Sequence, residues 1–360
     1  MGNCSCKSKK ELTRIIKSQV AKHRTECASK TNEIKPNFEG VILQSLQSLP
    51  SKEYLKYEFE AEGSFPLISE DPFAEKIINY RGANSYQYFS GSKIGVTCRK
   101  GLKNDFNQDN FFIHSKPPFL LAGVFDGHGP NGHLISALAR KNFPNFLLSN
   151  SALSQNPVDC IYNAFIKTQE EIVYKCEKSH NNCEISGCTA TIIFFYEDSV
   201  FIGQLGDSRA ILLRNCKGRL LSIPLTVDHN VNDPEEKARL EKNGGLIRQS
   251  SIDDNGKVSL PTHESYCLSV SRAFGDTAFS DIGVLCQPFI TEHQTGQRDT
   301  FIVMCTDGVW DCIENKEVAK ILEYNSPESA CNIIANLAWS RWIDKHQDRV
   351  DDITVLIIPL

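Results

Sequence analysis

Short apolar runs rich in β-branched and aromatic residues recur along the chain from about residue 91, each bounded by turn residues. Such runs are typical of β-strands. They predict strands at Phe111–Ile113, Phe119–Phe125, Ala190–Tyr196, Val200–Leu205, Ala210–Arg214, Phe301–Cys305 and Ile353–Ile358. Neighbouring strands come in pairs with hairpin-sized gaps, which favours antiparallel sheets.

Helix signals stand between these strands. Asp233 is an N-cap before Pro234, and Gly244 ends the segment that follows. A second helix opens at Ser326-Pro327-Glu328 and runs toward Trp342, and a third follows Pro157. These cap positions are typical of helix starts and stops. Paired strands followed by paired helices predict an α+β layered domain rather than a βαβ fold.

The N-terminal third has a different pattern. Residues 1–44 form a basic segment, residues 45–90 lack clear periodicity and indicate a connector, and residues 91–360 carry the catalytic-domain signals. Hydrophobic residues make up 41% and charged residues 23% of the chain, which is typical of a folded soluble domain. No apolar run approaches the roughly 20 residues of a membrane span.

Charge is distributed unevenly. The whole chain carries −5, but residues 1–25 hold seven Lys and Arg against one Glu, a net +6 that leaves −11 for the rest. An acidic body disfavours nucleic acid as a partner, and a basic N-terminal segment suggests an anionic surface.

Four aspartates stand at strand ends. Asp126 and Asp307 each follow an apolar strand, whereas Asp109 and Asp351 each precede one. If the strands are antiparallel neighbours, all four carboxylates meet at one edge of the sheets. Like charges that close together need a cation, and oxygen ligands suit Mg²⁺ or Mn²⁺, two of which can share bridging carboxylates. Paired metals activate water and neutralise a phosphoryl group.

His128 follows Asp126 by two positions and is a candidate to protonate a leaving oxygen, because histidine titrates near neutrality. Each of these residues, taken alone, also fits an ordinary turn. We interpret Asp207 and Asp276 in that structural way.

The order of six motifs resembles that of the metal-dependent protein phosphatase 2C family of serine/threonine phosphatases. The motifs are Val124-Phe125-Asp126-Gly127-His128-Gly129, Ser186-Gly187-Cys188-Thr189-Ala190, Gly206-Asp207-Ser208-Arg209, Ser271-Arg272-Ala273-Phe274-Gly275-Asp276, Thr306-Asp307-Gly308-Val309-Trp310-Asp311 and Asp351-Asp352-Ile353-Thr354. The resemblance covers residues 91–360, about three quarters of the chain. It implies a layered α-β-β-α sandwich of two antiparallel sheets flanked by helix pairs, acting as a monomer.

The resemblance also implies residue roles. Two Mg²⁺ or Mn²⁺ ions are held by side chains and one carbonyl, and a third ion sits at a weaker site. The implied ligands of the two ions are Asp109, Asp126, Asp307, Asp351 and the Gly127 carbonyl, and those of the third ion are Glu184 and Asp311. His128 is the implied general acid for the departing Ser or Thr alkoxide, and residues 228–261 match the flap beside the family's active site.

Three positions depart from the family pattern. Gln108 stands where the family often has Glu, and Glu184 stands where Asp is usual. The phosphate-binding arginine of the family has its best match in Lys103, one residue out of step, with Arg99 close by. Lysine is a point charge where arginine grips phosphate with two parallel bonds, so the identity matters.

The N-terminus resembles an acylation signal. Gly2 is the implied myristoylation site, although Cys6 occupies the position where Ser or Thr is preferred, and Cys4 and Cys6 are palmitoylation candidates. Two acyl groups, or one with a basic patch, are needed for stable anchoring. This predicts a cytoplasmic protein at the inner face of a membrane; without acylation it would be cytosolic, with an unmodified basic tail.

Three functions remain open on the sequence. The first is an active phosphatase acting on phosphoserine and phosphothreonine in phosphoprotein substrates. The second is a weak or inactive phosphatase-like scaffold, which the presence of all four acids and His128 disfavours. The third is another two-metal phosphoesterase such as a nuclease, which the acidic body disfavours.

Overall fold

The computed structural model describes residues 58–64, 74–81, 84–248, 256–261, 265–346 and 349–360. The basic segment 1–44 and the acylation positions Gly2, Cys4 and Cys6 lie outside these residues. Within the described residues, no helix has the length and apolar character that crossing a membrane requires.

Two antiparallel sheets form the centre of the domain. The larger has seven strands in the order β16-β9-β8-β5-β4-β1-β2, and the smaller has five in the order β11-β10-β17-β18-β3. The larger sheet consists of β1 (Phe59–Gly63), β2 (Ile78–Arg81), β4 (Asn110–Lys116), β5 (Phe119–Phe125), β8 (Ala190–Tyr196), β9 (Ser199–Leu205) and β16 (Phe289–Gln294). The smaller consists of β3 (Gly95–Arg99), β10 (Arg209–Cys216), β11 (Arg219–Pro224), β17 (Asp299–Cys305) and β18 (Ile353–Pro359).

The two sheets pack face to face through alternating apolar side chains. Ile113 and Val124 of the larger sheet meet Met304 and Leu356 of the smaller in one buried cluster. Because both faces of each sheet are covered, strands such as β18 are buried at every position. Burial of each large aliphatic side chain contributes roughly 1.5–3 kcal/mol.

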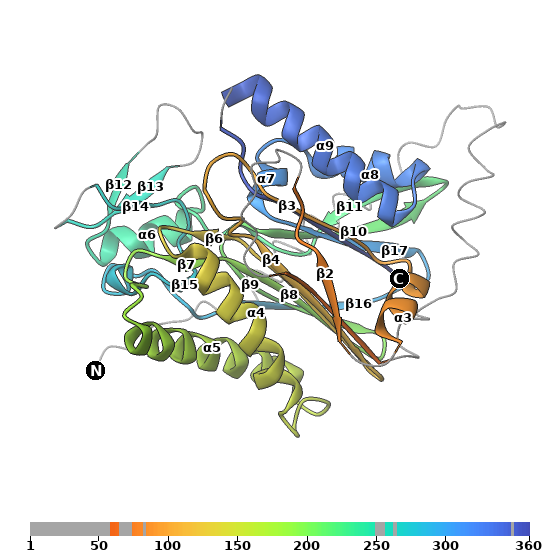
Figure 1. Ribbon diagram of the computed structural model, residues 1–360, viewed down its shortest axis with the longest axis horizontal. Helices are drawn as coiled ribbons and strands as arrows, with labels where there is room; N and C mark the ends of the chain where they lie inside the picture. The colour runs from red at the N-terminus through yellow and green to blue at the C-terminus, as the bar shows by residue number, and fades with distance from the viewer. Residues whose placement is uncertain (1–57, 65–73, 82–83, 249–255, 262–264, 347–348) are drawn as a thin grey trace.

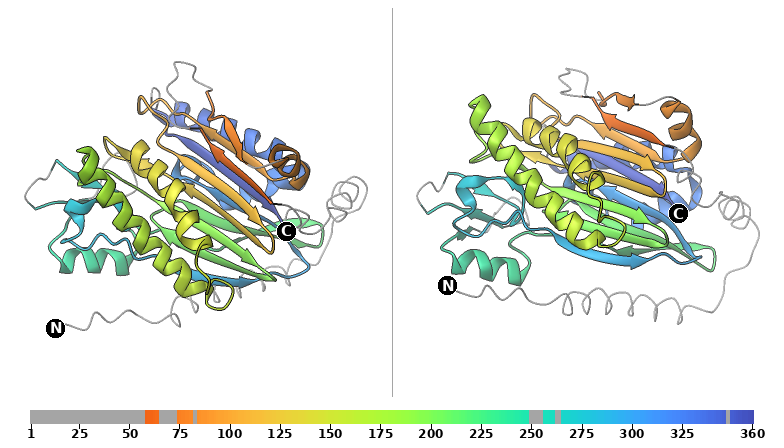
Figure 2. Two further views of the ribbon diagram at one scale, coloured as in Figure 1. Left: turned by 60° about the horizontal axis from the view of Figure 1, so that its bottom comes forward. Right: turned by 90° about the horizontal axis from the view of Figure 1, so that it is seen from below.

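Helix pairs cover the outer faces (Figures 1 and 2). Helices α4 (Gly132–Leu148) and α5 (Pro157–Ser179) pack on the larger sheet through a cluster that includes Phe143 and Phe165. Helices α8 (Asn315–Tyr324) and α9 (Pro327–His346) pack on the smaller sheet. The predicted four-layer α-β-β-α sandwich is therefore confirmed.

The segment 45–90, predicted as a connector or N-terminal extension with at most one strand or helix packed on the main domain, holds more ordered elements where the structure describes it. Strands β1 and β2 extend the larger sheet beyond β4, and helix α3 (Ser85–Ser92) packs on β1. The sheet thus includes residues well before position 91, since β1 pairs with β4 although about fifty residues of chain separate them.

Small elements gather at one end of the sandwich, opposite the C-terminus (Figure 1). Helix α6 (Pro234–Lys242) packs beside a three-stranded sheet of β12 (Leu246–Arg248), β13 (Lys257–Ser259) and β14 (Cys267–Leu268). Asp233 caps α6 by accepting from the backbone of Glu235 and Glu236, as predicted. This unit includes most of the predicted flap, residues 228–261.

Candidate active site

The four predicted acids lie at one edge of the sandwich because of strand register. Asn110 pairs with Phe125 across β4 and β5, which places Asp109 and Asp126 at adjoining strand ends. Cys305 pairs with Val355 across β17 and β18, so Asp307 and Asp351 lie just beyond adjoining ends of the other sheet. The two sheets therefore each bring one pair of acids to the same edge.

The acids are close enough to perturb one another. Partial burial raises the pKa of Asp126 well above its usual range, and the charges of Asp307, Asp109 and Asp351 raise it further. Burial and the charge of Asp351 likewise raise the pKa of Asp307, whose carboxyl shares a hydrogen bond with Asp126. Their proximity costs free energy that a bound cation would relieve.

Asp109 is the most deeply buried of the four, with 1% of its surface exposed. Its Oδ2 accepts hydrogen bonds from Thr306 Oγ1 at 2.8 Å and Thr354 Oγ1 at 2.7 Å. Its Oδ1 is buried without a hydrogen-bond partner among the described residues. A buried carboxylate oxygen left unpaired is costly, so this atom is suited to an electropositive ligand.

Close backbone packing fixes the loop after β5. A Cβ on Gly127 would lie 2.5 Å from the Gly132 carbonyl oxygen and 2.7 Å from that of Gln108, so no larger residue fits there. The Asp126 amide donates to Thr189 Oγ1 at 3.1 Å, and the Thr189 amide returns a bond to the Asp126 carbonyl at 2.8 Å. The first metal-ligand candidates are therefore held by backbone geometry.

The two predicted phosphate-binding residues differ in position. Lys103 Nζ lies 2.7 Å from Asp351 Oδ2, and the charges of Asp351, Asp307 and Asp126 raise the pKa of Lys103, so it remains a cation beside the acids. Arg99 is buried, and its guanidinium donates to Glu75 and to Asn336 of α9, each at 2.7 Å. The structure therefore corrects the sequence prediction by assigning Arg99 to packing and leaving Lys103 as the candidate.

His128 lies between the acids and a small three-stranded sheet. That sheet joins β6 (Gly127–His128), β7 (Gly187–Cys188) and β15 (Phe274–Gly275). His128 Nε2 is 2.6 Å from Oδ2 of Asp276, the residue that follows β15. Our sequence interpretation of Asp276 as an ordinary turn residue missed this contact.

The comparisons with known proteins agree with this geometry. The family model described as Protein phosphatase 2C matches residues 88–344. Two relatives from Arabidopsis thaliana are each 33% identical to this chain: probable protein phosphatase 2C 61, covering 75% of this chain and 84% of the relative, and probable protein phosphatase 2C 72, covering 74% and 85%. This chain belongs to the protein phosphatase 2C family.

A solved structure supports the same fold. The serine-threonine phosphatase 2C from Toxoplasma gondii aligns with a TM-score of 0.65 at 18% identity, covering 82% of this chain and 98% of that one. The family comprises serine/threonine protein phosphatases that depend on divalent metal ions, and this protein is one of them. The resemblance seen in the six sequence motifs is thereby confirmed.

Both acids predicted for a third ion of this phosphatase, Glu184 and Asp311, are exposed. Glu184 is exposed, and its carboxylate accepts from Asn182 Nδ2 at 3.4 Å. Asp207, which the sequence indicated as an ordinary turn residue, is buried beside other acids: burial raises its pKa well above the usual range, and the charges of Asp307, Asp228 and Asp311 add to the effect. The role of Glu184 at a third site stays a prediction, and the turn assignment of Asp207 missed its neighbour Asp311.

The donor set of this phosphatase fits a hard divalent ion. In the described part of the chain, no three His, Cys, Asp or Glu side chains are already arranged as a set of metal ligands. Two of the candidate carboxylates have other contacts, because Lys103 pairs with Asp351 and Asp126 pairs with Asp307. All candidate donors are nevertheless carboxylate or carbonyl oxygens, and Asp109 Oδ1 is unpaired. Oxygen donors of this kind suit Mg²⁺ or Mn²⁺.

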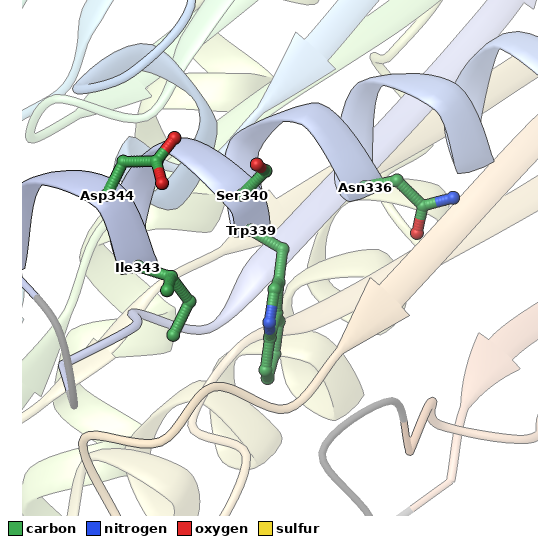
Figure 3. A pocket seen from close by; sticks show the side chains of 5 residues that line it. All are labelled: Asn336, Trp339, Ser340, Ile343 and Asp344. Atoms are coloured by element: carbon green, nitrogen blue, oxygen red, sulfur yellow. The ribbon is translucent and has the colours of Figure 1, made fainter.

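A shallow pocket lies on the other helical layer. Its lining comes from one face of α9 and includes Trp339 and Ile343, shown in Figure 3. Asn336, also in this pocket, accepts the hydrogen bond from Arg99. None of the residues that line the pocket is a candidate ligand or His128, so it is not part of the active site.

Proposed function

We propose that this phosphatase hydrolyses phosphoserine and phosphothreonine in proteins by attack of a metal-activated water, using two Mg²⁺ or Mn²⁺ ions and acting as a monomer. The observation that carries the proposal is the meeting of four aspartates at one edge of the two sheets, where Asp109 Oδ1 is buried without a hydrogen-bond partner among the described residues. Carboxylates that raise one another's pKa are poorly stable without a cation. Bound divalent ions supply the activation of water and the neutralisation of phosphoryl charge.

The chain's own groups have distinct tasks in this proposal. Asp109, Asp126, Asp307, Asp351 and the Gly127 carbonyl hold the ions. Lys103 attracts the phosphate through its positive charge, which the neighbouring acids maintain. The rigid backbone around Gly127 keeps the ligands in place before substrate binds.

His128 acts on the leaving group. As the phosphorus–oxygen bond breaks, its electron pair remains on the Ser or Thr oxygen, and His128 gives that oxygen a proton. Such general acid catalysis contributes roughly 10²–10⁴-fold for a poor leaving group. A nitrophenolate is stable without a proton and needs His128 far less.

The test compares three substrates over a titration of Mg²⁺ and Mn²⁺: a phosphoserine peptide, nitrophenyl phosphate and a nucleic-acid phosphodiester. We expect metal-dependent release of phosphate from the peptide and no cleavage of the diester. Peptide activity that persists in chelator would contradict the metal-dependent mechanism, and cleavage of the diester alone would replace phosphatase by nuclease. Inactivity on all three would favour the scaffold.

We also propose that residues 1–25 anchor the protein to the inner face of a membrane through acyl groups on Gly2, Cys4 and Cys6. The support is the sequence motif together with the net charge of +6 over that segment. Gly2→Ala should shift the protein to the cytosol. Cys4→Ser with Cys6→Ser should leave salt-sensitive binding, because one myristoyl chain gives an association constant of only about 10⁴ M⁻¹.

Fractionation of cells that express each form measures this anchoring, with phosphopeptide turnover as the control that should not change. Wild-type protein found only in the cytosol, or Gly2→Ala retained on membranes after a salt wash, would contradict the proposed anchoring. Neither result affects the proposed catalytic mechanism, since every proposed catalytic group lies between residues 103 and 351.

A further inference from the structure

We infer that Asp276 is a positioning residue for His128: its carboxylate orients the imidazole toward the departing alkoxide. The inference rests on the proposed function, in which His128 protonates the leaving oxygen. It adds a residue that the two-metal mechanism does not use. Three observations carry it: the contact, the backbone that produces the contact, and the chemistry of the pair.

The contact is short and one-sided. Asp276 Oδ2 lies 2.6 Å from His128 Nε2, and the Asp276 side chain is 1% exposed whereas that of His128 is 24% exposed. The other oxygen, Oδ1, is buried with no hydrogen-bond partner among the described residues. A turn aspartate normally bonds to nearby backbone amides. Here the carboxylate is withdrawn from water and directed at a single imidazole.

Backbone geometry enforces that direction. Gly187 pairs with His128 on one side and with Gly275 on the other, which places the residue after Gly275 beside the histidine. A Cβ on Gly187 would lie 2.2 Å from Asp276 Oδ2 and 2.4 Å from the Phe274 carbonyl oxygen, so the carboxylate and the backbone of β15 together occupy the volume that any other residue there would fill.

The turn that carries Asp276 is strained. Asp276 has φ 47° and ψ 40°, in the left-handed region, and Gly275 before it has φ 78°. An aspartate in this conformation costs free energy that surrounding contacts must offset. Gln169 of α5 supplies such contacts, because its side-chain amide bonds both the amide and the carbonyl of Gly275, at 2.8 and 3.1 Å.

The pair has a defined proton chemistry. An ionised carboxylate only accepts hydrogen bonds, so Nε2 of His128 carries the proton that it shares with Asp276, and Nδ1 is the nitrogen available to substrate. In the imidazolium form Nδ1–H donates its proton to the alkoxide oxygen as the phosphorus–oxygen bond breaks. The Asp276 carboxylate thus fixes the tautomer and the orientation of the imidazole, as the aspartate of a Ser-His-Asp triad does.

Asp276→Asn is the main test, because it preserves shape and removes the charge. With saturating metal, we expect kcat on a phosphoserine peptide to fall roughly 10²-fold or more, within the range for general acid catalysis. KM and the metal concentration for half-maximal activity should stay unchanged. Turnover of nitrophenyl phosphate should fall far less. An equal loss on both substrates, or normal turnover of the peptide, would overturn the inference.

A double-mutant cycle separates positioning from a general structural effect. If Asp276 acts through His128, then His128→Ala with Asp276→Asn should be no slower on the peptide than His128→Ala alone. Multiplication of the two single losses would contradict the inference. If His128→Ala slows both substrates equally, the proposed role of His128 as general acid is contradicted. If His128→Ala behaves as expected but Asp276→Asn turns over the peptide normally, only the role of Asp276 is contradicted.

A second variant displaces the Asp276 carboxylate without changing Asp276 itself. Gly187→Ala introduces a Cβ into the space of Asp276 Oδ2 and should reproduce the loss that is selective for the peptide. Gly91→Ala is the matched control, since a Cβ at Gly91 has no neighbour within 4 Å. Thermal unfolding of each variant shows whether it folds. A folded Gly187→Ala protein with unchanged peptide turnover would argue against the contact.

Discussion

The two ends of strand β17 hold carboxylates in opposite electrostatic surroundings. Asp299 begins the strand and accepts from Arg214 Nε at 2.5 Å, from His293 Nε2 at 3.0 Å and from the Gly296 amide at 2.9 Å. Asp307 lies just beyond the other end, beside Asp126 and Asp351. One strand thus joins a fully paired acid to a crowded one.

The pKa shifts record this contrast. Burial alone would raise the pKa of Asp299, but hydrogen bonds from His293 and Arg214 outweigh burial and lower it to about 2. Burial and a neighbouring negative charge raise the pKa of Asp307. Paired acids stabilise the fold, whereas crowded acids destabilise it and are retained for a ligand.

Breaking the crowded set should have the largest effect on activity. Asp126→Asn removes one negative charge, and we expect kcat/KM on a phosphopeptide to fall roughly 10³-fold or more, since bound metal supplies several kcal/mol of charge stabilisation. In chelator the same variant should unfold at an equal or higher temperature than wild type. Near-normal turnover, or strong destabilisation without metal, would contradict the assignment.

Breaking the paired end should have the opposite profile. Asp299→Asn leaves Arg214 and His293 without their carboxylate and should cost about 2–3 kcal/mol, below the roughly 3–5 kcal/mol of a fully buried pair because Arg214 is partly exposed. Urea unfolding measures this cost. The kcat of the folded protein should not change, and a variant that loses activity but not stability would reverse the comparison.

The paired and the crowded acids also predict opposite responses of stability to pH. The folded pKa of Asp299 lies below its usual value of 3.8, so its contribution is complete above about pH 4 and is lost as pH falls toward 2. Asp352, next to Asp351 and just before β18, has a folded pKa raised to about 6 by burial and by Asp351, so the metal-free fold loses stability as pH rises from about 4 to about 6. In chelator, stability should therefore fall between about pH 4 and 6, and a rise over that interval would contradict the crowding argument.

Lys103 contacts Asp351, one of the crowded acids, and its replacement should have a moderate effect. Lys103→Met should raise KM for the phosphopeptide about tenfold, because one charge-assisted contact to phosphate is lost. Lys103→Arg should retain most of the affinity. Arg99→Lys is the contrasting variant, and a KM change there without a stability change would restore Arg99 as a phosphate ligand.

The smallest expected effect concerns the third ion. Asp207 lies near Asp311, a predicted ligand of that ion, and Asp207→Asn should raise the metal concentration needed for half-maximal activity by less than the roughly 10–100-fold seen when support for a metal ligand is removed. Glu184→Gln should leave that concentration unchanged, because Glu184 is exposed. An equal rise in that metal concentration for Asp207→Asn and Glu184→Gln would contradict the difference proposed between the two acids.

Local pattern predicted the elements that carry strong local signals. Strands β5 and β8 have the bounds that their apolar runs indicated, and Asp233 caps α6. Strands β1 and β2 were missed because their sequences, FEAEG and INYR, are mixed and gain order only by pairing with a distant strand. Helix α4 contains Pro144, which local rules take for a break.

The candidate active site likewise contains residues that local pattern predicts and residues that it does not. The four acids could be predicted because each stands at the end of a recognisable strand, and strand register alone brings them together. Asp276 could not, because its contact with His128 depends on the pairing of β6, β7 and β15, each only two residues long. The environment of Asp207 likewise arises from segments distant in sequence, so the local motif Gly206-Asp207-Ser208-Arg209 does not predict it.

Thermal unfolding during a titration with Mn²⁺ tests the central claim most directly, since it measures binding to the crowded acids without any substrate. A ligand that binds only the folded state stabilises it by about 2.7 kcal/mol at a hundred times its dissociation constant. Wild type should therefore melt at a higher temperature as Mn²⁺ is added, and Asp299→Asn should show the same increment from a lower start. Asp126→Asn should lose most of the increment. A wild-type melting temperature that is indifferent to Mn²⁺, or an undiminished increment in Asp126→Asn, would contradict the account.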